Sequence, residues 1–346
     1  MNTSTDKTQI HKAQHGTITA FYWSQDGNQL AVVDTENRIT LYPMADLQKS
    51  PVQVHVPASG QLGKVAFHPA QPQFAVSNYQ KIKVFDAEKG DLQYELEFPD
   101  YVAHSVAYSP DARFLGVTMC HHSADPYGND GNNDGTFGLW DMQHAKWVLL
   151  RITTYPATTV CFDAPTNHLI WTTTEGVVYL WDMTNLSEIG RFHQPMQTLI
   201  YALPTFLGEA ILIEQSDDYS RQHWVWHPMT DRVERLSSLQ KLTTFVTPPD
   251  EPLYFVLQDD HVVHNYTVEE NDIPLPPSLA FRYQFHYQTH IWDAHRNRIV
   301  YTLRDFRSGS DPLALHVSTH QLAFVGENNL YVIDLRDQTT RITFVP

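Results

Sequence analysis

A short pattern of apolar and polar positions recurs along the whole chain. An apolar run ends in an aromatic or aliphatic marker residue, a polar turn follows, and a second apolar run begins seven positions after the marker. Two such runs separated by turn residues are typical of a β-hairpin. A repeat of this length therefore predicts an array of hairpins. The marker and the start of the second run stand at Trp23/Leu30, Phe67/Phe74, Tyr108/Leu115, Phe162/Leu169, Val246/Leu253, Trp292/Ile299 and Leu315/Leu322, with a looser copy at Leu203/Ile211.

A third apolar run follows most hairpins at a nearly constant distance. It ends nineteen positions after the marker in the copy from Phe67 to Asp86, and twenty positions after it in the copy from Phe162 to Asp182. In the copy that begins at Tyr108 the distance is thirty-three, which indicates an insertion of about fourteen residues. A more variable fourth run follows. Four strands in roughly forty residues, without a helical period, are typical of the blades of a β-propeller.

Four short segments carry a family resemblance. Trp23-Ser-Gln-Asp-Gly, Tyr108-Ser-Pro-Asp-Ala, Trp140-Asp141 and Trp181-Asp182 resemble the WD-repeat β-propeller family, and the likeness extends over nearly the whole chain. The sequence departs from the family pattern because the Gly-His pair before the first strand is missing. No repeat holds a complete network of His, Ser or Thr, Trp and Asp. We therefore expect apolar packing to stabilise the blades.

The resemblance and the repeat together predict an all-β fold, a single β-propeller domain over residues 1–346 with seven four-stranded blades. The hairpin at Trp292 and Ile299 has no recognisable third strand, so it is interpreted as an extra hairpin, with an eighth blade as the alternative. Residues Thr8–Ala13 could add a closing strand beside Thr340–Val345 and so protect exposed sheet edges. The blades are expected at 14–55, 60–98, 102–152, 156–193, 197–237, 241–286 and 312–346, and the extra hairpin at 287–306.

The charge of the chain limits its partners. There are 39 acidic and 23 basic residues, giving a formal net charge of −16, and no Lys or Arg cluster interrupts the excess. We therefore expect neither nucleic acid nor a membrane as a partner. No apolar leader and no run of about 20 apolar residues is present, which predicts a soluble, cytoplasmic protein. The 19 histidines could make association sensitive to mild acid, with scattered surface histidines as the alternative.

Loops that depart from the repeat are the candidates for function, because the strands are committed to packing. The long loops 120–135 and 216–222 both join a second strand to a third, so we expect them on one face. Their carboxylates and aromatic rings predict a docking surface for a protein or peptide of basic or mixed charge, with two ordinary acidic loops as the alternative. The predicted contact residues are Asp125, Tyr127, Asp130, Asp134, Asp217, Asp218, Tyr219 and Arg221.

The first of these loops also contains part of a calcium-binding pattern. Asp130, Asn132 and Asp134 are followed by a glycine, and Asp141 falls at the twelfth position of the pattern. Plain hairpin turns need the same residue types. No cofactor is therefore expected, with calcium at Asp130, Asn132 and Asp134 as the alternative. Cys161 stands in a first strand, where a buried apolar role is expected.

The sequence contains no familiar catalytic motif. A Gly-rich phosphate loop, a Gly-x-Ser-x-Gly elbow and a His-Glu-x-x-His pair are all missing. The sequence therefore predicts a non-enzymatic scaffold for protein interactions. The alternative is a metal-dependent enzyme or a small-ligand binder at the mouth of the propeller channel, where His104, His290 and His316 of the first strands could meet.

Overall fold

The computed structural model describes most of the first two thirds of the chain and separate strands beyond it. The described residues fall into two compact units: the large unit comprises Ala13–Leu236, and the small unit comprises Ser237–Pro346 with Met1–Lys12. The expectation of one domain over residues 1–346 stays a prediction. The described residues are 16–46, 49–57, 62–121, 135–163, 166–193, 198–204, 211–216, 221–235, 244–246, 254–258, 288–293, 298–304, 313–316, 319–326, 329–334 and 339–344.

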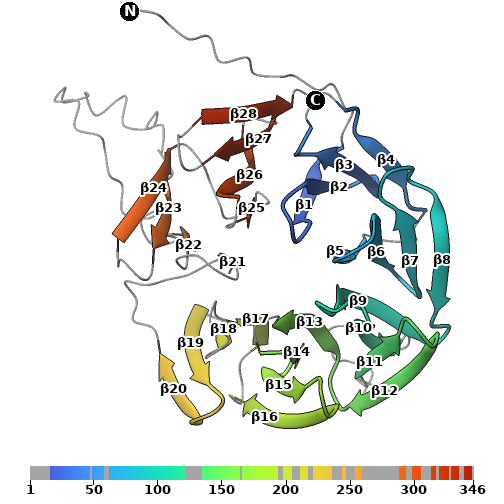
Figure 1. The fold of residues 1–346 in the computed structure, drawn as a ribbon. Helices are drawn as coiled ribbons and strands as arrows, with labels where there is room; N and C mark the ends of the chain where they lie inside the picture. The colour runs from blue at the N-terminus through green and yellow to red at the C-terminus, as the bar shows by residue number, and fades with distance from the viewer. Residues whose placement is uncertain are drawn as a thin grey trace, which may run out of the picture. The chain divides into compact units, whose positions relative to one another are not determined.

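The described part of the large unit forms five four-stranded antiparallel sheets, each made of four consecutive strands (Figure 1). No helix occurs among the described residues. The strands are β1 (Ile18–Trp23), β2 (Gln29–Asp34), β3 (Arg38–Pro43), β4 (Val52–His55), β5 (Val65–Phe67), β6 (Gln73–Asn78), β7 (Lys81–Asp86), β8 (Leu92–Glu97), β9 (Tyr101–Tyr108), β10 (Phe114–His121), β11 (Gly135–Asp141), β12 (Lys146–Thr153), β13 (Ala157–Asp163), β14 (His168–Thr173), β15 (Val177–Asp182), β16 (Ser187–His193), β17 (Thr198–Pro204), β18 (Ile211–Ser216), β19 (Arg221–His227) and β20 (Arg232–Arg235).

The small unit contributes two further sheets of the same kind from its described residues. The strands are β21 (Thr244–Val246), β22 (Tyr254–Gln258), β23 (Gln288–Asp293), β24 (Arg298–Arg304), β25 (Leu313–His316), β26 (Gln321–Gly326), β27 (Asn329–Asp334) and β28 (Thr339–Phe344). Seven four-stranded sheets among the described residues match the seven expected blades. The closing strand at Thr8–Ala13 lies outside the described residues and stays a prediction.

The interpretation of residues 287–306 as an extra hairpin was wrong. Strand β23 pairs with β22, where Trp292 lies opposite Phe255, and β24 pairs with β23. The hairpin therefore supplies the third and fourth strands of the sixth sheet, whose blade had been expected to end at 286. The error arose because residues 259–287 separate the second strand from the third, and a connection of this length concealed the repeat.

Most of the predicted hairpin pairs lie opposite one another in the sheets, but two are shifted by one residue: Leu203 pairs with Leu212 rather than Ile211, and Val246 with Tyr254 rather than Leu253. Trp23 pairs with Leu30, and the same register holds in the hairpins that begin at Phe67, Tyr108, Phe162 and Leu315. The turn chemistry explains this register. In the first hairpin Ser24 Oγ donates a hydrogen bond of 2.6 Å to Asp26 Oδ1, so a serine and an aspartate close the turn between two apolar strands.

Apolar side chains pack between successive sheets of the large unit. The β1–β4 and β5–β8 sheets share a buried cluster that includes Ile39, Leu41 and Phe74, and similar clusters join the following neighbours. The buried indole N–H of Trp181 has no hydrogen-bond acceptor among the described residues. Apolar packing therefore stabilises this blade, as expected from the incomplete polar network.

Candidate functional site

Most of the predicted docking residues lie outside the described residues. Arg221 is the exception, because it begins β19 and pairs in register with Ser216 at the end of β18. The docking face and the calcium pattern therefore stay predictions. The residues outside the description are Asp125, Tyr127, Asp130, Asn132, Asp134, Asp217, Asp218 and Tyr219.

Asp141, the twelfth residue of the calcium pattern, is engaged in a turn. It ends β11, is 1% exposed, and accepts backbone hydrogen bonds of 2.9 Å from both Gln143 and His144. The Nδ1 atom of His144 lies 3.0 Å from Asp141 Oδ2, and Arg113 Nη2 lies 3.5 Å from the same oxygen. The carboxylate thus closes the turn between β11 and β12.

Acid is expected to weaken this turn. The hydrogen bond from His144 and the backbone amides lower the pKa of Asp141 from 3.8 to about 2. The unfolded chain therefore takes up the proton first, so the stability that Asp141 contributes is complete above about pH 4 and is lost as the pH falls toward 2. We expect urea unfolding midpoints of Asp141→Asn to depend less on pH across this window than those of the wild type. Parallel curves for the two proteins would contradict the assignment.

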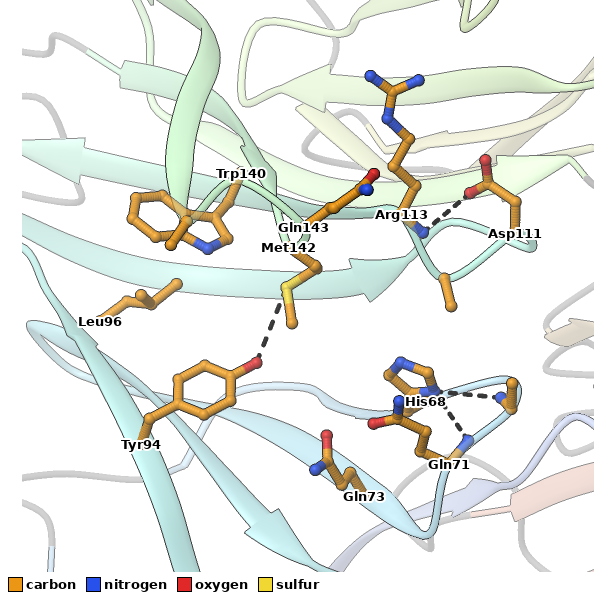
Figure 2. A pocket seen from close by; sticks show the side chains of 13 residues that line it. His68, Gln71, Gln73, Tyr94, Leu96, Asp111, Arg113, Trp140, Met142 and Gln143 are labelled. Carbon is orange, nitrogen blue, oxygen red and sulfur yellow. Dashed lines mark hydrogen bonds between the residues drawn. The ribbon is translucent and has the colours of Figure 1, made fainter.

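A groove lies between the β5–β8 and β9–β12 sheets of the large unit (Figure 2). Its volume is about 880 Å³, and its walls come from β8 and from the turns β5–β6, β9–β10 and β11–β12. These turns join first strands to second and third strands to fourth. The long loops 120–135 and 216–222 join second strands to third, so the groove lies at the opposite ends of the strands.

One side of the groove is apolar and half-buried. Tyr94 and Leu96 of β8 line it together with Trp140 and Met142 at the end of β11. The Tyr94 hydroxyl lies 3.8 Å from the Met142 sulfur, a contact that Figure 2 shows as a dashed line. Trp140 packs edge-on against Trp147, with 5.1 Å between ring centroids. Rigid aromatic rings and a polarisable thioether suit packing against apolar side chains of a ligand.

The other side of the groove contains His68 in a defined tautomer. Its Nδ1 atom accepts hydrogen bonds from the backbone N–H groups of Ala70, at 3.1 Å, and Gln71, at 2.9 Å. An Nδ1 atom that accepts leaves the proton on Nε2. Burial lowers the pKa of His68, which favours this neutral form. Figure 2 shows the second ring nitrogen directed toward the side of the groove that holds Met142, so His68 offers a neutral hydrogen-bond donor there.

The remaining polar groups of the groove are uncharged or already engaged. The Arg113 guanidinium lies over the Phe114 ring at 4.7 Å, and Figure 2 shows it directed away from the apolar side. The side-chain amides of Gln71, Gln73 and Gln143 line the groove and make no hydrogen bond with a described residue. Each amide offers donors and an acceptor to a ligand. The groove therefore combines an apolar side with neutral hydrogen-bonding groups, beside two charged side chains that have partners of their own: Arg113, and Asp111, whose Oδ1 atom accepts from the Ser109 hydroxyl and the Arg113 N–H.

The histidines considered for a channel site have other partners where they are described. His104 Nε2 lies 3.0 Å from the Cys120 sulfur, and His316 Nδ1 lies 2.8 Å from the Thr319 hydroxyl. The side chain of His290 lies outside the described part. Within that part, no three His, Cys, Asp or Glu side chains gather closely enough to hold a metal ion, and no helix has the length and hydropathy needed to cross a membrane.

The sequence pattern did not indicate the groove, because the groove consists of regular turn and strand residues and not of the irregular loops. The available signal was the composition of regular turns: a methionine and a glutamine follow Trp140-Asp141, and two glutamines lie in the first turn of the second blade. Which turns lie side by side depends on how neighbouring blades pack. These residues could therefore be assigned to one groove only from the tertiary structure.

Comparisons with known proteins agree with the sheet architecture. No protein-family model matches the sequence, and no curated protein matches it. Among solved structures, the chain is similar to the β-propeller domain of Cps50 (Swd1) from Myceliophteria thermophila, with 12% identity and a TM-score of 0.63. The alignment covers 94% of this chain and 98% of that domain. At such identity the likeness concerns the fold alone, and it confirms that this chain is a β-propeller.

Proposed function

We propose that this protein is a non-enzymatic interaction scaffold, and that the groove between the β5–β8 and β9–β12 sheets binds an extended segment of a partner protein. The observation that carries the proposal is the pairing of an apolar side with uncharged hydrogen-bonding groups in one groove of about 880 Å³. The propeller fold supports a scaffold in general, because its loops and turns stand on stable sheets.

An extended peptide suits these walls chemically. Its backbone carbonyl and N–H groups can pair with the amides of Gln71, Gln73 and Gln143, while the Nε2–H of His68 can donate to a further carbonyl. Apolar peptide side chains can pack against Leu96 and the methionine and tryptophan beside it. Since no uncommitted charge is directed at the apolar side, we expect an uncharged segment here.

The groove is also suited to binding because its turns are already ordered. The β5–β6 turn is closed by the two hydrogen bonds to His68 Nδ1, and the β11–β12 turn by the bonds to Asp141. A wall that is ordered before binding loses little conformational entropy when a ligand arrives. The interaction energy of the contacts is then available for affinity.

The acidic loop face is a second proposed surface of the same scaffold. It would use the loops 120–135 and 216–222, with Asp125, Tyr127 and Tyr219 among its residues, and it would take a partner of basic or mixed charge. Its support is the composition of the two loops and their common place between second and third strands. The two surfaces lie at opposite strand ends, so they can be tested separately.

The test is selection of peptides from a displayed random library on the purified protein, followed by calorimetric titration of the selected peptides. We expect Met142→Lys to weaken binding of a groove peptide about tenfold or more, because it places a charge on the apolar side. Met229→Lys is the matched control, since Met229 is 82% exposed in the β19–β20 turn, away from the groove.

A deletion of residues 123–133 separates the two surfaces. A peptide that is lost with Met142→Lys but kept by the deletion supports the groove. A peptide that is lost only with the deletion assigns binding to the loop face and counts against the groove. If binding survives both changes, or no peptide is selected, the scaffold proposal fails for these two surfaces.

A further inference from the structure

The acceptor that closes the β5–β6 turn is a histidine, whereas the first and third blades use a serine and an aspartate in the same turn. His68 stands one position after its marker residue, as Ser24 does in the first blade and Ser109 in the third. Both serines donate a hydrogen bond of 2.6 Å to an aspartate two positions further on. Hydroxyls and carboxylates keep their protonation between about pH 5 and pH 8, but imidazole does not. The second blade therefore has a turn whose closing group titrates near neutral pH.

The two hydrogen bonds of this turn require the neutral ring. The Nδ1 lone pair of His68 accepts from the N–H groups of Ala70 and Gln71, as the dashed lines of Figure 2 show. A proton on Nδ1 would occupy this lone pair, so that a donor would face two other donors. Rotation of the ring about its bond to Cβ would not restore the bonds, because both nitrogens of an imidazolium carry a proton. Protonation therefore removes both hydrogen bonds at once.

Loss of these bonds affects the groove directly. The ring packs against Tyr108, with 5.0 Å between centroids and 61° between the ring planes, and Ala70 and Gln71 line the groove with His68. Burial also lowers the pKa of His68. The open turn therefore takes up the proton first, so the stability that His68 gives the turn is complete above its ordinary pKa of 6.5 and is lost as the pH falls through the lower pKa of the folded protein.

The neighbouring titratable groups do not form an ion pair with this ring. Those that line the groove with His68 or contact its ring are Tyr94, Tyr108, Asp111 and Arg113. Burial raises the pKa of both tyrosines, so they stay neutral. The β11–β12 turn adds His144, whose Nδ1 atom lies 3.0 Å from Asp141 Oδ2. In the described part of the chain, no carboxylate lies within salt-bridge distance of His68.

We propose that His68 is a pH-sensitive switch of the groove, and that its protonation in mild acid opens the β5–β6 turn and releases the bound segment. Release has two physical causes: the wall formed by the turn loses its order, and an imidazolium places a charge beside a groove that suits an uncharged segment. Release of a segment rests on the groove function proposed above, whereas opening of the turn does not.

The first experiment follows the free full chain by nuclear magnetic resonance between pH 7.5 and pH 5.0. Ring-nitrogen shifts report the tautomer and protonation of His68, and amide exchange reports the hydrogen bonds of Ala70 and Gln71. We expect both amides to exchange about threefold faster or more as the ring is protonated, after correction for the pH dependence of exchange in an unstructured chain. The Asn28 amide is the internal control, because it donates at 3.0 Å to the Asp26 carboxylate, and a carboxylate stays ionised in this range.

His68→Asn is the matched variant. The side-chain oxygen of an asparagine accepts from backbone N–H groups in such turns and does not titrate, so we expect no increase in exchange at positions 70 and 71. Wild-type amides whose exchange does not follow the titration overturn the switch. The same increase in wild type and variant also overturns it, because the acid effect would then pass through a group such as His144 that both proteins contain.

The second experiment measures binding of a peptide that is selected at pH 7.5 and lost with Met142→Lys. We expect its affinity for the wild type to fall about threefold or more at pH 5.0, because only the protein with a neutral ring binds. The ratio of affinities at the two pH values should be smaller for His68→Asn, and an equal ratio overturns control of the groove by His68. If no peptide is selected, the scaffold proposal fails, while amide exchange still decides whether the turn opens.

Discussion

Replacement of Trp171 by alanine is expected to lower the free energy of unfolding by roughly 3–5 kcal/mol. The side chain lies in β14 and is 1% exposed. Its ring stacks on Tyr179 with 3.9 Å between centroids and on Phe137 with 5.1 Å, so it joins the β9–β12 and β13–β16 sheets. Truncation removes both contacts and leaves a large cavity. Urea unfolding followed by fluorescence and circular dichroism measures the loss.

Trp171→Phe is the matched control. It keeps a ring between Phe137 and Tyr179, and it removes an indole N–H that has no hydrogen-bond acceptor among the described residues. Loss of an unsatisfied buried donor offsets part of the lost packing, so we expect a cost of about 1 kcal/mol. Equal destabilisation by alanine and phenylalanine would show that stacking is not what holds the two sheets together.

The second large effect is expected for Gly135→Ala, with a loss of about 3 kcal/mol or more. A Cβ atom at this first residue of β11 would lie 2.1 Å from the Tyr155 carbonyl oxygen, 2.5 Å from the Ala157 nitrogen and 2.7 Å from Pro156 Cα. All three atoms belong to the backbone that enters the next sheet. They cannot rotate away as a side chain can, so the chain leading into β13 must shift.

Gly190→Ala in β16 is the comparison for this prediction. Its Cβ atom would lie 3.2 Å from ring atoms of Trp226, a side chain that can move by a few tenths of an ångström. We expect a change of about 1 kcal/mol or less, partly offset by the reduced entropy of the unfolded chain. Thermal and urea unfolding of both variants will compare them. Similar stability of the two would mean that the close approach at Gly135 relaxes without cost.

Local sequence signals were sufficient for most of the hairpins. The marker residues define strand pairs such as Trp23 and Leu30 because a seven-residue interval with a Ser-x-Asp turn leaves one register that keeps both apolar faces inside. The third and fourth strands of the sixth sheet were assigned to an extra hairpin for the opposite reason. The second and third strands of this sheet are separated by residues 259–287, and pairing across such a distance depends on non-local contacts that no local pattern encodes.

The two candidate sites, the acidic loop face and the groove, also differ in whether local sequence indicates them. The sequence draws attention to the irregular loops, whose composition still predicts an acidic docking face at residues such as Asp125 and Asp217. The groove instead consists of ordinary turn and strand residues, among them His68, Tyr94 and Met142, which lie far apart in the sequence. Only the packing of the second blade against the third brings them together.

The sequence by itself determined the repeat, the strand order within every blade but the sixth and the β-propeller fold, because each hairpin forms from contacts between residues close in the chain. The tertiary structure decided which side chains meet between blades. It placed the Lys64 amine against the Val160 carbonyl and His68 beside the Tyr108 ring, at 5.0 Å between centroids. These contacts depend on how whole sheets pack against one another. Each packing surface consists of side chains from several strands, so it forms only when the whole sheet is in place.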